Sequence, residues 1–119
     1  MSTVTLTADS FESTVTENDI VFVDFWAAWC GPCRMFAPIF EKASDANPDI
    51  VFGKVDTEAE QALAAGARIT SIPTLMAFKA GALVFSQPGA LPAAALEQVI
   101  ASVRDLDVEA ALVEQKRSA

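Results

Sequence analysis

The stretch from Ile20 to Trp26 is the feature that most restricts the fold of this chain. Six of its seven residues are apolar, and Asp24 is the single charged residue within it. A strand with one face in water alternates apolar and polar residues, whereas a strand buried on both faces is apolar almost throughout. The run therefore predicts a central strand in a sheet that helices cover on both faces.

The rest of the chain alternates short β-type runs with stretches of helical periodicity. Strands are expected over residues 4–6, 20–26, 50–55, 74–79 and 82–86, and helices over residues 10–17, 33–47, 58–65 and 92–106. Strands joined through a helix should be parallel. Ala80-Gly81 marks a turn, so the last two strands should form an antiparallel hairpin. The prediction is an α/β fold with a mixed sheet of about five strands flanked by about four helices.

The length of 119 residues suits a single domain. The expected elements place that domain in residues 1–106. Residues 107–119 form a C-terminal extension, acidic and then basic, which is expected to be helical or disordered. A frayed, solvated continuation of the last helix is favoured over a docking segment.

Composition and charge exclude several classes of function. A net charge of -8 repels phosphate, so binding to nucleic acid through its backbone is not expected. No apolar run approaches the ~18 residues that indicate a membrane span. The N-terminus shows neither the basic start nor the apolar core of a signal peptide. A cytoplasmic protein, expected to be a monomer, is the interpretation that fits.

The segment Trp29-Cys30-Gly31-Pro32-Cys33 lies where the buried strand gives way to a helix. A cysteine at a helix start is near free N–H groups and the positive end of the dipole, which favour the thiolate. The thiolate is the attacking species in disulfide exchange. Two intervening residues keep the second sulfur close enough to attack a mixed disulfide intramolecularly. Pro32 suits the first helical turn.

Two simpler interpretations of the cysteine pair are weaker. A structural bridge that closes so short a loop would stabilise the fold by about 2 kcal/mol, against about 4.7 for a loop of 100 residues. A structural zinc ion needs four ligands, and the chain has two cysteines and no histidine. A metal site would need two chains to share it, so no metal is expected.

The segment 23–33, which reads VDFWAAWCGPC, closely resembles the active-site segment of thioredoxins. Further similar segments are Lys54-Val55-Asp56, Ile72-Pro73-Thr74-Leu75, Phe78-Lys79 with Gly81, and Gly89-Ala90-Leu91. Their order and spacing agree from about residue 4 to residue 106. The resemblance implies the thioredoxin fold, with Cys30 as the nucleophile and Cys33 as the resolving thiol. It also implies two kinds of partner, disulfide-containing substrate proteins and a thioredoxin reductase. The chain has no nucleotide-binding motif, and no cofactor of its own is expected.

The resemblance assigns roles to two charged residues outside the motif. Asp24 matches a buried acid that assists proton transfer at the second cysteine. From the residues alone, a capping or hydrogen-bonded aspartate at a strand end is an equal alternative. Lys54 matches a lysine near that acid and would bias its charge, although a plain surface lysine needs no such role.

The resemblance also implies a shallow apolar groove beside the cysteines. The Ile72–Pro73 bond is expected to be cis, against the 5–6% frequency of cis X–Pro bonds in general. Ile72 would offer backbone groups to an extended substrate peptide. The remaining residues expected to line this groove are Trp29, Gly31, Pro32, Pro73, Gly89 and Ala90.

The chain departs from the family pattern in ways that leave alternatives open. It has no tyrosine, and residues 67–71 read ARITS where many members carry an aromatic-Gly pair. An oxidant or isomerase is a second interpretation, although strongly oxidising relatives usually carry a histidine between the cysteines. A third is a binding or chaperone-like subunit that uses the groove, with incidental redox activity.

Overall fold

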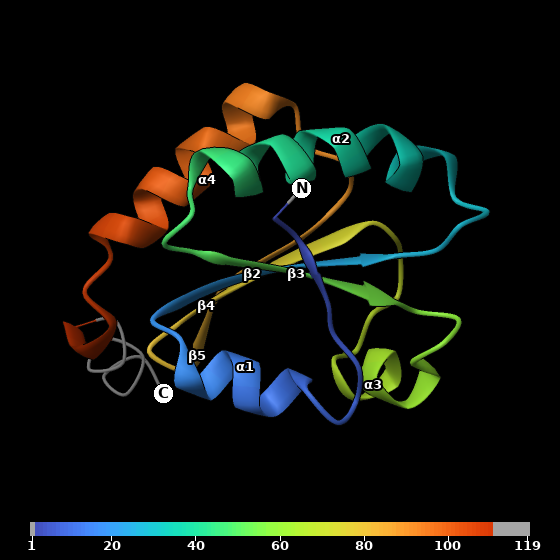
Figure 1. The fold of residues 1–119 in the computed structure, drawn as a ribbon, viewed down its shortest axis with the longest axis horizontal. Helices are drawn as coiled ribbons and strands as arrows, with labels where there is room; N and C mark the ends of the chain where they lie inside the picture. Colours follow the sequence, from blue (N-terminus) through green and yellow to red (C-terminus); the bar gives the residue numbers. More distant parts are fainter. Residues whose placement is uncertain (1, 111–119) are drawn as a thin grey trace.

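In the computed structural model, residues 2–110 are described, and they form one α/β layer arrangement (Figure 1). The elements follow the predicted order βαβαβαββα. They are β1 (Val4–Thr5), α1 (Phe11–Glu17), β2 (Ile20–Trp26), α2 (Gly31–Ala46), β3 (Val51–Asp56), α3 (Gln61–Gly66), β4 (Thr74–Lys79), β5 (Ala82–Pro88) and α4 (Ala93–Asp105). The predicted fold class is confirmed.

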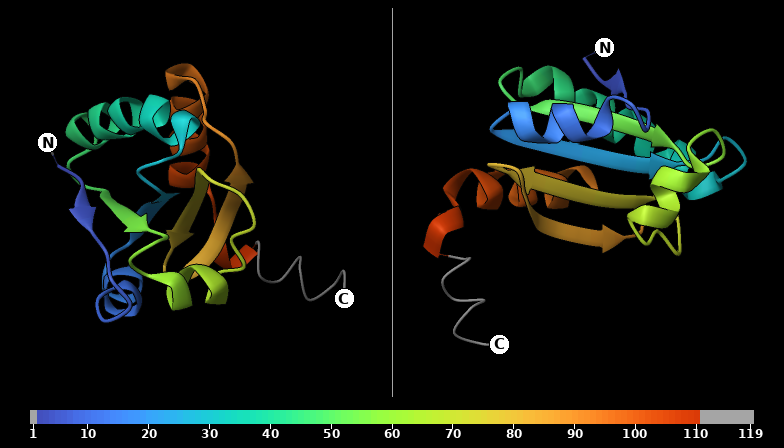
Figure 2. Two further views of the ribbon diagram at one scale, coloured as in Figure 1. Left: turned by 90° about the vertical axis from the view of Figure 1, so that its right-hand side faces the viewer. Right: turned by 90° about the horizontal axis from the view of Figure 1, so that it is seen from below.

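The sheet is mixed, with strand order β1-β3-β2-β4-β5. The strands β1, β3 and β2 are parallel, while β4 runs antiparallel to β2 and forms the predicted hairpin with β5. The helices α2 and α4 cover one face, and α1 and α3 the other (Figures 1 and 2). The apolar run of the sequence is therefore the middle strand, covered on both sides.

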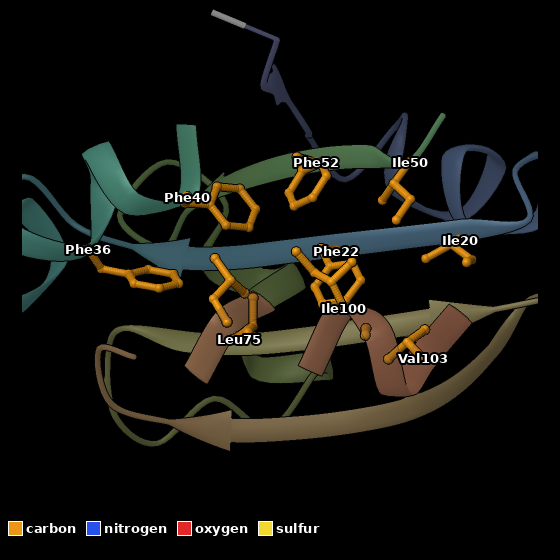
Figure 3. Close-up of a cluster of buried hydrophobic side chains, with 11 residues drawn as sticks. Ile20, Phe22, Phe36, Phe40, Ile50, Phe52, Leu75, Ile100 and Val103 are labelled. Carbon is orange, nitrogen blue, oxygen red and sulfur yellow. The ribbon is translucent and has the colours of Figure 1, made fainter. Parts of the chain in front are cut away.

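The larger core cluster lies between the sheet and the α2/α4 layer (Figure 3). The rings of Phe22 and Phe52 stack there at 5.5 Å, and Phe40 meets Phe52 edge-on at 5.2 Å. Such aromatic pairs stabilise the fold beyond the area that they bury. This packing holds α2, which carries the cysteines, against β2 and β3.

Two helices begin two or three residues away from their predicted starts, whereas α1 and α4 begin one residue later than predicted. The helix α2 begins at Gly31 rather than at residue 33, because Cys30 is its N-cap and Pro32 lies in its first turn. The helix α3 begins at Gln61 rather than at residue 58. There the Asp56 carboxylate accepts the backbone N–H groups of Glu58 and Ala59, which holds these residues in a turn.

The last helix ends at Asp105, and a further helical turn begins over residues 108–110. Most of the predicted C-terminal extension, from residue 111 onward, lies outside the described residues. Within residues 2–110, no helix has the length and apolarity needed to cross a bilayer.

The ammonium group of Lys79, at the end of β4, caps the C-terminal end of α4. It donates hydrogen bonds of 2.7–2.8 Å to three carbonyl oxygens, those of Val103, Arg104 and Leu106. We expect Lys79→Met to lower the free energy of unfolding by about 2 kcal/mol, because these carbonyls lose a charged donor. Urea unfolding checks this, with exposed Lys42→Met as the control. An equal loss in both variants would contradict a specific capping role.

Candidate active site

The two cysteines are held at the N-terminus of α2 by the turn that follows β2. Cys30 is the N-cap residue, and its backbone N–H donates to the carbonyl of Ala27 at 3.2 Å. The structure has Cys30 and Cys33 joined in a disulfide, with their Cα atoms 5.2 Å apart. The backbone N–H of Cys33 donates to the Cys30 sulfur at 3.2 Å. In the reduced protein this donor and the 16-residue helix would stabilise a Cys30 thiolate.

The two sulfurs are placed unequally. Cys30 lies beside the exposed Trp29, and its sulfur is 3.7 Å from the carbonyl oxygen of Ile72. Cys33 lies one turn further into α2. Cys30 is 5% exposed and Cys33 2%, so the two cysteines differ in their neighbours rather than in burial.

A shallow hollow of about 350 Å³ opens next to Cys30. Its lining combines apolar side chains with three hydroxyl groups: Trp29, Thr57, Ala64, Ile69, Thr70, Ser71 and Ile72. Trp29 is 67% exposed, and its indole N–H donates to the Glu58 carboxylate at 2.6 Å. This hydrogen bond places the ring as one wall of the hollow.

The predicted groove residues are only partly brought together in this hollow. Trp29 and Ile72 line it. The Ile72–Pro73 bond is cis, as the resemblance implies. Gly89 lies next to Pro73, because its N–H donates to the Pro73 carbonyl at 2.8 Å. Pro73 and Gly89, like Gly31, Pro32 and Ala90, lie outside the lining of the hollow.

Asp24 is buried in the middle of β2 and is 0% exposed. Neither of its carboxylate oxygens has a hydrogen-bond partner in the described part of the chain. Burial raises the pKa of Asp24 from its ordinary 3.8 to about 7, and the positive charge of Lys54 partly offsets that rise. A carboxyl group with such a pKa can take up and release a proton near neutral pH.

Lys54 is directly opposite Asp24 in the register of β2 and β3. Its ammonium group does not hydrogen-bond to that carboxylate. It lies instead over the ring of Trp26, 5.1 Å from the ring centroid. Sequence reasoning placed the lysine near the acid but missed its contact with Trp26.

Sequence reasoning also missed Glu58, the partner of the Trp29 indole. In the sequence, Glu58 is an acidic residue shortly after the third strand, and that position does not by itself indicate a contact with Trp29. No group of three or more His, Cys, Asp or Glu side chains suited to a metal ion occurs among residues 2–110.

Comparisons with known proteins agree with this geometry. The thioredoxin family model matches residues 2–102. The chain belongs to the thioredoxin family. It is 56% identical over 121 residues to a thioredoxin homologue from Streptomyces coelicolor, with 99% of this chain and 90% of the relative covered. It is 42% identical to thioredoxin-1 of Saccharomyces cerevisiae, with 81% and 92% covered.

Solved thioredoxin structures show the same fold. A thioredoxin variant from Halobacterium salinarum superposes with a TM-score of 0.80 at 31% identity, covering 88% of this chain and 92% of that one. Oxidised mitochondrial thioredoxin 3 from Saccharomyces cerevisiae gives 0.77 at 35% identity, covering 88% and 96%. Thioredoxins are protein-disulfide oxidoreductases that a reductase returns to the dithiol form. This member is a thiol–disulfide oxidoreductase that works by dithiol–disulfide exchange through Cys30 and Cys33.

Proposed function

We propose that this thioredoxin reduces disulfide bonds of cytoplasmic proteins as a monomer, with Cys30 as nucleophile and Cys33 as resolving thiol. The observation that carries the proposal is the Cys30 sulfur at the N-cap of α2, where it accepts the N–H of Cys33. The Cys30 thiolate attacks a substrate disulfide, forms a mixed disulfide and releases one substrate thiolate. Cys33 then attacks the Cys30 sulfur, releases the second substrate thiolate and leaves the Cys30–Cys33 disulfide. A thioredoxin reductase supplies the two electrons that restore the dithiol.

Asp24 has the properties required of the proton acceptor in the second half of this cycle. Cys33 must lose its proton before it attacks, because the thiolate is the nucleophile. The raised pKa of Asp24 suits proton exchange near neutral pH, and Lys54 would bias its charge. We expect Asp24→Asn to slow the resolution of the mixed disulfide by at least about tenfold. Rapid-quench analysis of the mixed disulfide measures this step. An unchanged rate would mean that Asp24 does not accept the proton of Cys33.

The hollow between Trp29 and Ile72 is the proposed site for the residue that flanks the substrate cysteine. Backbone groups of Ile72 would align an extended substrate segment, with Gly31, Pro32, Pro73, Gly89 and Ala90 around it. We expect Trp29→Ala to lower kcat/KM for a protein disulfide about tenfold, equivalent to about 1.4 kcal/mol. A small-molecule disulfide, which does not fill the hollow, is the control substrate. Equal losses on both substrates would place the effect on Cys30 itself.

The reduction potential of the Cys30/Cys33 pair tests the proposed direction of electron flow. Equilibration with glutathione buffers, followed by trapping of free thiols, should give a potential well below that of the glutathione pool. A value near that of oxidising compartments would favour an oxidant or isomerase. The double variant Cys30→Ser, Cys33→Ser separates the binding-subunit alternative, because a pure binding role would survive it.

A further inference from the structure

Three side chains on one face of the sheet form a small charged and aromatic group beneath α2. Asp24 and Trp26 alternate along β2 and therefore point to the same face. Lys54 is the register partner of Asp24 on the parallel strand β3, which puts its side chain on that face too. On this face, the Lys54 ammonium group has two neighbours within reach, the Asp24 carboxyl group and the Trp26 ring.

The ammonium group of Lys54 is found at the ring. It lies 5.1 Å from the centroid of Trp26, within the range of a cation–π interaction. The indole is itself held in place: it packs against the buried cluster of Ala27, Cys30 and Cys33. Its N–H group is buried without a hydrogen-bond partner among residues 2–110. The face of the ring, not its polar edge, is thus the part that contacts a charged group.

We propose that Trp26 is a positioning residue whose indole face holds the Lys54 ammonium beside the Asp24 carboxyl group. The proposal rests on the role proposed above for Asp24. Without the ring, the flexible four-carbon stem of Lys54 would carry the ammonium out to water, as long charged side chains do. A move inward to form a dry ion pair with Asp24 is disfavoured, because the ammonium would lose its hydration.

Around Asp24, Lys54 carries the charge that the substitutions below remove, and the other neighbouring groups stay the same. Asp56, further along the same face of β3, has its carboxylate bound to the backbone N–H groups of Glu58 and Ala59. The neighbouring strand β4 places Leu75 opposite Asp24, and leucine carries no charge. The helix α2 contributes Cys33, which does not titrate in the disulfide. The oxidised protein therefore isolates the effect of Lys54 on Asp24.

A double-mutant cycle on the oxidised protein tests the proposal. The pKa of Asp24 is measured from its carboxyl carbon by NMR in the native protein, Trp26→Leu, Lys54→Met and the double variant. We expect Trp26→Leu to raise this pKa by about half a unit more when Lys54 is present than when it is methionine. Changes in burial caused by the leucine occur in both backgrounds and cancel. Equal shifts in both backgrounds, or a smaller rise with Lys54 present, would overturn the proposal.

A second measurement needs no substitution and keeps the proposal testable if Trp26→Leu does not fold. The ring current of Trp26 should move the Lys54 Cε proton signals upfield of those of the exposed Lys42. Coincident signals would overturn the proposal. Trp26→Phe removes the indole N–H but keeps a ring face, so it should retain part of the coupling with Lys54. A loss as complete as that in Trp26→Leu would also contradict it. Because these measurements need no substrate, they can fail while the reductase function stands.

Discussion

A Cys30→Ser variant is expected to lose disulfide-reductase activity by at least about a thousandfold, because the attacking thiolate is gone. Cys33→Ser should behave differently. It keeps the nucleophile Cys30 at the N-cap of α2 but lacks the resolving thiol, so the reaction should stop at the mixed disulfide with the substrate. Turnover is measured with a chemical dithiol as electron donor, and the adduct is detected on a non-reducing gel.

The cysteine content of the chain makes this pair of variants its own control. The chain has two cysteines, so any covalent adduct of Cys33→Ser must be at Cys30. Cys30→Ser, which leaves only Cys33 one turn further into α2, should form little adduct under the same conditions. If instead Cys30→Ser accumulates the adduct, the two roles are reversed. Wild-type activity in either single variant would contradict a mechanism that needs both thiols.

The sheet and its order follow from patterns that are local in sequence. The run Ile20–Trp26 forms β2 with the predicted bounds, because in a strand covered on both faces the apolar run begins and ends with the strand. The strand Thr74–Lys79 also has its predicted bounds, since the Ala80-Gly81 turn closes it. The turn requires positive φ at both residues, 52° and 81°, which Gly81 adopts readily.

The contacts that shape the site depend on pairs distant in sequence, and the pattern of one segment does not contain them. Trp29 and Glu58 are 29 residues apart and meet because β2 and β3 end side by side. Strand pairing brings Lys54 opposite Asp24, but the rotamer that turns its ammonium toward Trp26 depends on packing. The starts of α2 and α3 differ from the prediction for another reason, because they depend on capping and turn contacts between residues two or three positions apart.

The buried carboxyl group of Asp24 should make the stability of the oxidised protein fall as pH rises. The unfolded chain releases this proton near the ordinary value of 3.8, whereas the folded protein keeps it until about pH 7. Between these values the folded state binds more protons, so the free energy of unfolding decreases with pH. One pKa unit corresponds to about 1.4 kcal/mol, which makes the total decrease about 4 kcal/mol. Below and above this window Asp24 contributes no slope.

Asp24→Asn removes this titration, so the variant should gain about 4 kcal/mol relative to the native protein between pH 4 and pH 8. The test is how the difference in the free energy of unfolding between variant and native protein changes with pH. The buried amide is itself unpartnered, and it destabilises the variant equally at every pH. Denaturant unfolding at pH 4, 6 and 8 measures the difference. Exposed Asp9→Asn is the matched control and should show no such gain. A constant difference between Asp24→Asn and the native protein would mean that Asp24 ionises in the folded state as easily as in the unfolded chain. The acid would then be a carboxylate of ordinary pKa at neutral pH, and a much weaker base toward the Cys33 thiol.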